Sequence, residues 1–485
     1  MRSPATWDYK RVVAVAFVVG VFMDVLDVTI VNVALPTIGR RFGSSDTGLE
    51  WVVTAYLLSL AVWIPASGWF GDRIGTKRVF LTALAVFTLG SAMCGLAQSI
   101  GQLIAFRVAQ GVGGGMMVPV GQSMLFRAFP PGERARASAV LSIPSVLGPA
   151  LGPVLGGVIT THASWRWIFL INIPFGFAAF AFSARYLKEH REPTAGEFDR
   201  GGFMLSALAF GSLLFGLAEV PRRGWRAPIS FGPALAGLVL LGVLVAYETW
   251  HPDPMLAFRL FRDRMFRVGS IVGLFGMGAF VGSLFLLPLY LQRLRGLSPQ
   301  TSGLTTFTQA LGYIAVSRTV GKVYLRVGPR RMMVTGLALS GVFNLAFVNL
   351  GVETNLWWIR LIMFGRGTCL PMLFIPLQAS SFANISPRDT GRGSSLFSTA
   401  RQVSSALGVA VLGAILFTAL KAKTATAVAA GVTGRALKEI QLTAYHRAFL
   451  WVAIFYFVGA VVSLLVRDAD AANTMAQPTA SAEAG

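Results

Sequence analysis

The sequence predicts an all-α polytopic membrane protein, and three observations support this fold class. Of the 485 residues, 54% are hydrophobic and 13% are charged, and the mean hydropathy is +0.64. Apolar runs of spanning length recur along the chain, and spans of ~20 residues each would use a little over half of it. One polar motif occurs twice, far apart, which indicates two related halves. These features exclude a water-soluble globular fold.

Fourteen apolar runs are long enough to cross a bilayer. They lie near residues 12–35, 50–71, 79–97, 102–122, 138–160, 167–187, 201–220, 228–248, 267–291, 302–321, 332–350, 357–381, 394–418 and 448–466. The first run is too long for the apolar core of a signal peptide and lacks a small-residue cleavage site, so we expect an uncleaved first span.

The loops between these runs predict the orientation of the chain. An even number of spans places both termini on one side of the membrane. Alternate loops hold about 24 Lys and Arg on that side and about 14 on the other. Because basic loops stay inside, both termini are predicted to be cytoplasmic in a bacterial plasma membrane. The linker 188–200 is then inside, and the long loop expected at 419–447 is outside.

Four arginines lie within the spans: Arg107, Arg318, Arg366 and Arg401. Arg318 and Arg366 lie within a few residues of a span end, from which a long side chain can reach the headgroups. Arg107 and Arg401 lie deeper and require a partner, because a charge in the bilayer interior is costly.

The remaining composition excludes several classes of protein. The net charge of +21 is explained by orienting loops, and no basic run with interleaved aromatics suggests nucleic-acid binding. Cys94 and Cys369 lie in apolar runs without metal or redox spacing. No phosphate-binding loop, zinc-binding histidine pair or nucleophile elbow occurs. We therefore expect no catalytic residue, no metal site and no coupling to ATP hydrolysis.

The repeated motif predicts the domain organisation. It covers 68–78 and 321–331, and the 253-residue offset corresponds to about eight helices at ~32 residues each. Two six-helix bundles interrupted by two extra helices explain this offset. The predicted domains are an N-terminal six-helix bundle (1–187), a linker with two inserted transmembrane helices (188–266), a C-terminal six-helix bundle (267–467) and a disordered cytoplasmic tail (468–485).

The first span carries two carboxylates, Asp24 and Asp27, three residues apart on one helical face with Asn32 at its edge. Each costs roughly 2.5–3.5 kcal/mol at the bilayer centre, so a cavity or a partner is expected there. Arg107, in a descending fourth helix, lies at a depth comparable with that of Asp27. An Asp27–Arg107 ion pair is therefore predicted, either purely structural or involved in proton transfer.

Five motifs in register carry a resemblance to a known family. They are 26–36 (LDVTIVNVALP), 51–56 (WVVTAY), 68–78 (GWFGDRIGTKR), 107–113 (RVAQGVG) and 148–157 (GPALGPVLGG). The chain resembles the major facilitator superfamily, and within it the fourteen-helix drug:proton antiporter branch. The second copy of the loop motif has Leu325 where the first has Asp72, which argues against a symmetric gate.

The resemblance implies the major facilitator fold and assigns roles to particular residues. Asp27 and Arg107 would couple protons, and Asp24, Asn32, Tyr56 and Gln110 would bind substrate. The gating residues would be Gly68, Asp72, Arg73, Gly75, Lys77, Arg78, Gly148, Pro149, Gly152, Pro153, Gly156 and Gly157.

The gating motifs also have explanations from the residues themselves. Asp72 is placed where a neighbouring helix N-terminus can receive a negative charge, which would latch the cytoplasmic side. The alternative is that the loop only fixes orientation. Gly148, Gly152 and Gly156 form a stripe that permits close helix packing, either with a gating role or without one.

Repeats, topology and intramembrane charges predict a secondary transporter that works by alternating access, and the resemblance implies a proton-coupled exporter of small hydrophobic, cationic compounds such as drugs or antibiotics. The proton is the coupling ion and no other cofactor is expected. The expected partners are the small-molecule substrate and the lipid bilayer, with no nucleic acid and no obligate protein partner. A dedicated exporter of one endogenous metabolite or lipid is an open alternative, and an intramembrane enzyme or channel is a remote one.

Overall fold

The computed structural model describes residues 8–44, 46–193 and 195–475, and in that part of the chain all regular structure is helical. The first half contains α1 (Tyr9–Phe42), α2 (Asp46–Ile74), α3 (Thr76–Leu96), α4 (Ile100–Ala128), α5 (Arg134–Leu141), α6 (Ile143–His162), α7 (Trp167–Leu170) and α8 (Asn172–Tyr186). It is followed by α9 (Arg200–Arg223), α10 (Pro228–Trp250), α11 (Arg264–Pro288), α12 (Pro299–Val327), α13 (Pro329–Ala346), α14 (Leu356–Ser381), α15 (Thr390–Ala429), α16 (Gly434–Ser463) and α17 (Ala472–Met475).

The helices are long enough and apolar enough to cross a membrane repeatedly. Thirteen helical segments of the described chain meet both conditions. The helix α12 is 29 residues long but more polar, since it carries several threonines and ends in a basic stretch. It packs between α6 and α14, which brings the total to the fourteen predicted. The predicted all-α, fourteen-helix membrane fold is confirmed.

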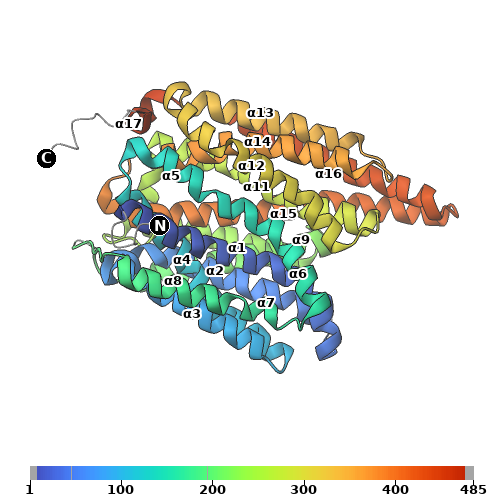
Figure 1. Ribbon diagram of the computed structural model, residues 1–485, viewed down its shortest axis with the longest axis horizontal. Helices are drawn as coiled ribbons and strands as arrows, with labels where there is room; N and C mark the ends of the chain where they lie inside the picture. Colours follow the sequence, from blue (N-terminus) through green and yellow to red (C-terminus); the bar gives the residue numbers. More distant parts are fainter. Residues whose placement is uncertain (1–7, 45, 194, 476–485) are drawn as a thin grey trace.

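The long helices lie side by side along the longest axis of the molecule (Figure 1). The helices α1–α4 and α8 gather in the lower half of the view and α11–α14 with α16 in the upper half, while α5 reaches into the upper half and packs against α12 and α14. The inserted helix α9 packs against α10, α2 and α15. The beginning of α1 and the short helix α17 lie at the left of the view, and we call this the terminal end and the opposite one the far end. The domain boundaries expected from the sequence stay a prediction.

The two copies of the repeated motif have the same backbone geometry. Gly75 begins α3 with a φ of 116°, and Gly328 begins α13 with a φ of 84°, which side chains other than glycine rarely adopt. Two residues after each glycine, a backbone N–H donates a hydrogen bond of 2.9 Å to a carboxylate, from Glu189 in the first copy and Asp468 in the second. Both helices thus carry an acid at the positive end of the dipole.

The structure differs from the sequence prediction at one loop and at the C-terminal tail. The long loop predicted at 419–447 is wrong, because α15 continues to Ala429 and α16 begins at Gly434, which leaves a short connection at 430–433. The extension is polar but rich in alanine and other strong helix formers, so it stays helical beyond the apolar span. It protrudes at the right of Figure 1.

The predicted disordered tail begins too early. Residues 468–471 form a 3₁₀ turn and Ala472–Met475 form α17. The hydroxyl groups of Tyr324 and Thr474 share a hydrogen bond of 2.5 Å. This contact and the Asp468 cap hold the segment against α12 and α13, so the prediction is wrong for 468–475. Residues 476–485 lie outside the described part of the chain.

Candidate functional site

A buried ion pair joins α1 and α4. One guanidinium nitrogen of Arg107 lies 2.5 Å from a carboxylate oxygen of Asp27, and both residues are 0% exposed. The other Asp27 oxygen accepts hydrogen bonds from the amides of Gln110 at 2.9 Å and Asn172 at 3.3 Å. The structure thus brings together three predicted residues and adds Asn172 from α8. Asn172 carries no sequence signal, because asparagine at a helix end usually serves as a cap.

The guanidinium of Arg107 is held on several sides. It donates to the side-chain oxygen of Gln110 at 2.8 Å and to the carbonyl of Val52 at 3.2 Å. Its plane lies 4.0 Å from the ring centroid of Tyr56, a cation–π contact. These contacts fix the orientation of the arginine and leave its charge to be balanced by Asp27.

Tyr56 links this ion pair to the second carboxylate of the first span. Its hydroxyl donates a 2.5 Å hydrogen bond to Asp24, while its ring supports Arg107. Gly114 on α4 lies directly beside this pair, with no room for a larger side chain. Asn32 is exposed and donates to the Val28 carbonyl of its own helix at 3.1 Å. Of the four predicted substrate-binding residues, Asp24, Tyr56 and Gln110 therefore belong to the network around the ion pair, and Asn32 stands apart.

The second half contains a similar cluster without an acid. Arg366 on α14 is 0% exposed, so the expectation that it reaches the headgroups is wrong. Its guanidinium donates to Gln309 at 2.8 Å, to Asn344 at 3.4 Å and to the hydroxyl of Ser283. Within the described chain its hydrogen-bond partners are neutral.

The repeat relates the two clusters. Arg107 and Arg366 lie on the fourth long helix of each half. Gln309 stands 253 positions after Tyr56, and Asn344 stands 253 positions after Ser91. The Ser91 hydroxyl belongs to the first cluster, because it accepts a hydrogen bond from Asn172 and donates one to the carbonyl of Phe169. The 253-residue offset of the loop motif would therefore have pointed to Gln309 and Asn344, but not to Arg366, which stands 259 positions after Arg107. Ser283 contacts Arg366 where Asp27 contacts Arg107, and no carboxylate among the described residues pairs with Arg366.

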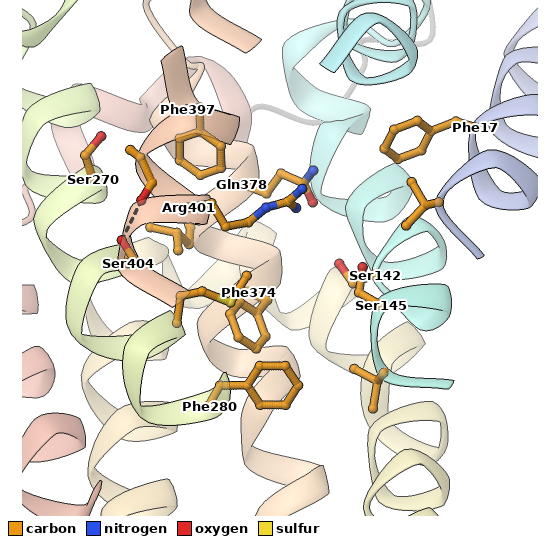
Figure 2. A pocket seen from close by; sticks show the side chains of 16 residues that line it. Phe17, Ser142, Ser145, Ser270, Phe280, Phe374, Gln378, Phe397, Arg401 and Ser404 are labelled. Carbon is orange, nitrogen blue, oxygen red and sulfur yellow. Dashed lines mark hydrogen bonds between the residues drawn. The ribbon is translucent and has the colours of Figure 1, made fainter. Parts of the chain in front are cut away.

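A cavity lies between the two halves (Figure 2). Its lining comes from α1, α6, α11, α14 and α15, together with Ser142 at the break between α5 and α6. Most of the lining is apolar, including Phe17, Phe280, Phe374 and Phe397. Arg401 is the charged residue of this lining, and it extends from α15 into the space between the halves (Figure 2).

The loop motif lies at the terminal end, between α2 and the beginning of α15. Asp72 is buried and accepts a 2.7 Å hydrogen bond from Arg127. It also lies against Gly391 in the first turn of α15, where a side chain would collide with its carboxylate. Gly68 meets the same glycine. Arg127 was not predicted, because it lies outside the motif.

The basic residues of this motif are placed differently. Arg73 and Arg78 are exposed and Lys77 is half-buried. The backbone N–H groups of Lys77 and Arg78 donate to Glu189 at 2.9 and 3.2 Å. Glu189 therefore caps α3 within the first half, whereas Asp72 faces the second half.

The glycine stripe of the fifth span lies on α6 and packs against α1. A side chain at Gly148, Gly152 or Gly156 would collide with α1 at residues 25, 29 and 33, respectively. The adjoining Pro153 contacts Gly303 of α12 in the second half, and Pro149 lies inside α6. Nothing lies within 4 Å of the position a side chain would take at Gly157. The helix α6 is thus tightly joined to α1 on one face and touches the other half on another.

The sequence matches the profile of the Major Facilitator Superfamily over residues 17–409, with a second match over 269–482. The chain belongs to this superfamily. The family predicted from the five motifs is therefore confirmed.

Relatives of known name lie within the same superfamily. The chain is 35% identical over 399 residues to the multidrug resistance protein B homolog of Mycobacterium tuberculosis strain H37Rv, covering 81% of this chain and 73% of that protein. It is 35% identical over 405 residues to a protein of Serratia proteamaculans provisionally named multidrug resistance protein MdtD, covering 82% and 83%. These relatives identify the chain as a major facilitator of the multidrug transporter type.

A solved structure supports the fold. The human organic anion transporter MFSD10 superposes with a TM-score of 0.63 at 16% identity, covering 94% of this chain and 100% of that chain. At this identity the likeness concerns the fold alone.

Proposed function

We propose that this protein is a proton-coupled exporter of small hydrophobic compounds that works by alternating access, with both termini and the terminal end of the bundle in the cytoplasm. The observation that carries the proposal is the Asp27–Arg107 pair. A carboxylate that is 0% exposed and has an arginine 2.5 Å away is ionised at low cost only while that contact exists. Loss of the contact therefore favours protonation.

Proton exchange would follow from movement of α4 relative to α1. With the helices packed as described, Arg107, Gln110 and Asn172 all donate toward the Asp27 carboxylate. When α4 moves away, the carboxylate loses its charged partner and its main amide donor, and it takes a proton. One residue thereby alternates between two protonation states as the cavity faces opposite sides.

The cavity supports hydrophobic substrates, since four phenylalanines and Met277 line it. The predicted preference for cations has no support in this lining, because Arg401 is its charged member and Asp24 is not part of it. Asp72 against α15 would close the cytoplasmic side, because a buried acid at a helix N-terminus joins the two halves in one state of the cycle.

Transport into inverted vesicles tests the proposal. Inverted vesicles with an acidic lumen are given matched cationic, neutral and anionic hydrophobic probes, with the pH gradient present or collapsed by a protonophore. We expect uphill accumulation that needs the gradient. Asp27→Asn should lose uphill accumulation yet keep substrate counterflow, because exchange of substrate for substrate needs no net proton movement.

A matched control is Glu439→Gln, an exposed carboxylate in the far-end hairpin. It should transport as the wild type does. Gradient-driven accumulation by Asp27→Asn at the wild-type rate would remove Asp27 as the coupling residue, and accumulation independent of the gradient in the wild type would remove proton coupling itself.

A further inference from the structure

Arg401 occupies the cavity without a partner of its own. It lies in the twelfth position of α15, well inside the span, and in the described chain its guanidinium has neither a hydrogen bond nor an ion pair within 4 Å. By contrast, Arg107 is paired with an acid, and Arg366 donates hydrogen bonds to several neighbouring side chains. An arginine in the membrane interior is costly unless something balances it. The guanidinium of Arg401 is therefore available to bind a ligand.

Asp24 does not serve as the counter-ion of Arg401. The two side chains attract each other electrostatically across the boundary between α1 and α15. They do not form an ion pair, and Asp24 already accepts the 2.5 Å hydrogen bond of Tyr56. Asp24 also does not line the cavity. The charged group that a ligand meets in this cavity is therefore the guanidinium of Arg401.

Two further donors in the lining are unused. The amide of Gln378 on α14 and the hydroxyl of Ser145 on α6 have no hydrogen bond to any residue that the structure describes. The other cavity hydroxyls differ, since Ser142, Ser270 and Ser404 each donate to a backbone carbonyl, as Figure 2 marks for Ser404. The unused donors come from both halves of the molecule.

We infer that the substrate of this transporter is an amphipathic anion, whose carboxylate or similar acidic group is bound by Arg401 with Gln378 and Ser145, and whose apolar body lies among the phenylalanines. The inference rests on the proposed function and specifies its substrate. A guanidinium matches a carboxylate with two parallel hydrogen bonds, and such charge-assisted bonds are strong where water is excluded. A cation in the same place would be repelled by Arg401.

The apolar part of the lining fits this substrate. Phe280 and Phe374 meet edge to face with centroids 5.3 Å apart, and Phe397 and Phe17 lie on other walls. A flat or extended hydrocarbon body packs against such rings with little hydrogen-bond demand. The acidic group then supplies the orientation of the substrate.

Binding of three matched fluorescent probes tests the inference. They share one skeleton and differ at one end: dansylaminoundecanoic acid, its primary amide and the corresponding terminal amine. We expect detergent-solubilised wild type to bind the acid about 10-fold more tightly than the amide and to bind the amine most weakly. Arg401→Gln should abolish the preference for the acid while leaving the amide affinity unchanged, and Arg401→Lys should keep part of it, because it retains the charge but not the planar fork.

Two controls make the result decisive. Arg318→Gln removes an arginine from the exposed face of α12 and should keep the preference. Gln378→Leu should lower the preference about 2-fold to 5-fold, and it remains a test if the Arg401 variants fail to fold. Equal wild-type affinity for acid and amide, tighter binding of the amine, or a full preference for the acid in Arg401→Gln would overturn the inference.

Failure of the proposed function is recognised separately. Gradient-driven uptake of the neutral amide, abolished by Asp27→Asn, would uphold proton-coupled export even where the acid is not preferred. Conversely, an Arg401-dependent preference for the acid without any gradient-driven uptake would leave anion recognition in place and remove the coupling.

Discussion

Removing one charge of the Asp27–Arg107 pair is expected to destabilise the protein as much as removing both. The pair is 2.5 Å long and 0% exposed, so a single neutral substitution leaves the other charge buried without a counter-charge. Breaking a buried pair in this way costs about 3–5 kcal/mol. Asp27→Asn and Arg107→Gln keep some of the hydrogen bonds with Gln110 and Asn172, so we expect about 3 kcal/mol for each. The double variant has no orphaned charge and should also lose about 3 kcal/mol, which gives a coupling free energy of roughly 3 kcal/mol.

The assay is a double-mutant cycle in which denaturant titration in detergent micelles gives the free energy of unfolding of each variant. A matched control is the exposed pair Arg435–Glu439, four residues apart on α16, for which the same cycle should give a far weaker coupling, because water screens the two charges. If the Asp27 and Arg107 effects add to within about 0.5 kcal/mol, the two charges are compensated independently and the argument for a mutually dependent pair fails.

Three further predictions concern the gate, the helix packing and the orientation. Asp72→Asn should keep expression but lower turnover in vesicle transport, because it removes an attraction of about 0.3–2 kcal/mol between Asp72 and α15. Glu189 caps α3 within one half, so Glu189→Gln should instead lower thermal stability with little change in turnover. The reverse pattern would contradict the latch. Gly152→Ala should cost about 1–3 kcal/mol of unfolding free energy, because the added carbon would lie 2.7 Å from Thr29 Cβ. Gly157→Ala should be neutral or slightly stabilising, because nothing lies within 4 Å of the added carbon. Equal effects of the two substitutions would contradict the packing argument. An impermeant maleimide on intact cells should label Thr433→Cys and not Arg191→Cys, with little background because Cys94 and Cys369 are 0% and 3% exposed, and the opposite labelling would reverse the orientation.

Much of the fold was predictable because the signals for it are local. A span is recognised from about 20 consecutive residues, and a loop glycine with a positive φ from its place in a repeated motif. The fourteen spans and the family therefore followed from the sequence. The far-end hairpin was missed for a related reason. Hydropathy detects the bilayer and not the helix, so a polar helix that continues beyond the membrane looked like a loop.

The candidate site was predictable only in part. Asp27 and Arg107 were paired because two opposite charges at similar depth seldom remain apart in a bilayer. Their amide partner Asn172 was missed, because its contact with Asp27 depends on how α8 packs against α1. The Asp72 partner Arg127 was missed because its side chain reaches Asp72 across the packed helices α2 and α4.

The sequence by itself determined which residues lie in the membrane, which carry charge there and which family they resemble. The tertiary structure decided what each buried charge meets. Arg366 was expected near a span end but lies inside α14 and donates to Gln309 and Ser283, while Arg401 faces a cavity between the two halves. The physical reason is that depth follows from position along a helix, whereas the partner of a side chain depends on the rotation of that helix and on which helix packs beside it. These are set by contacts between residues hundreds of positions apart.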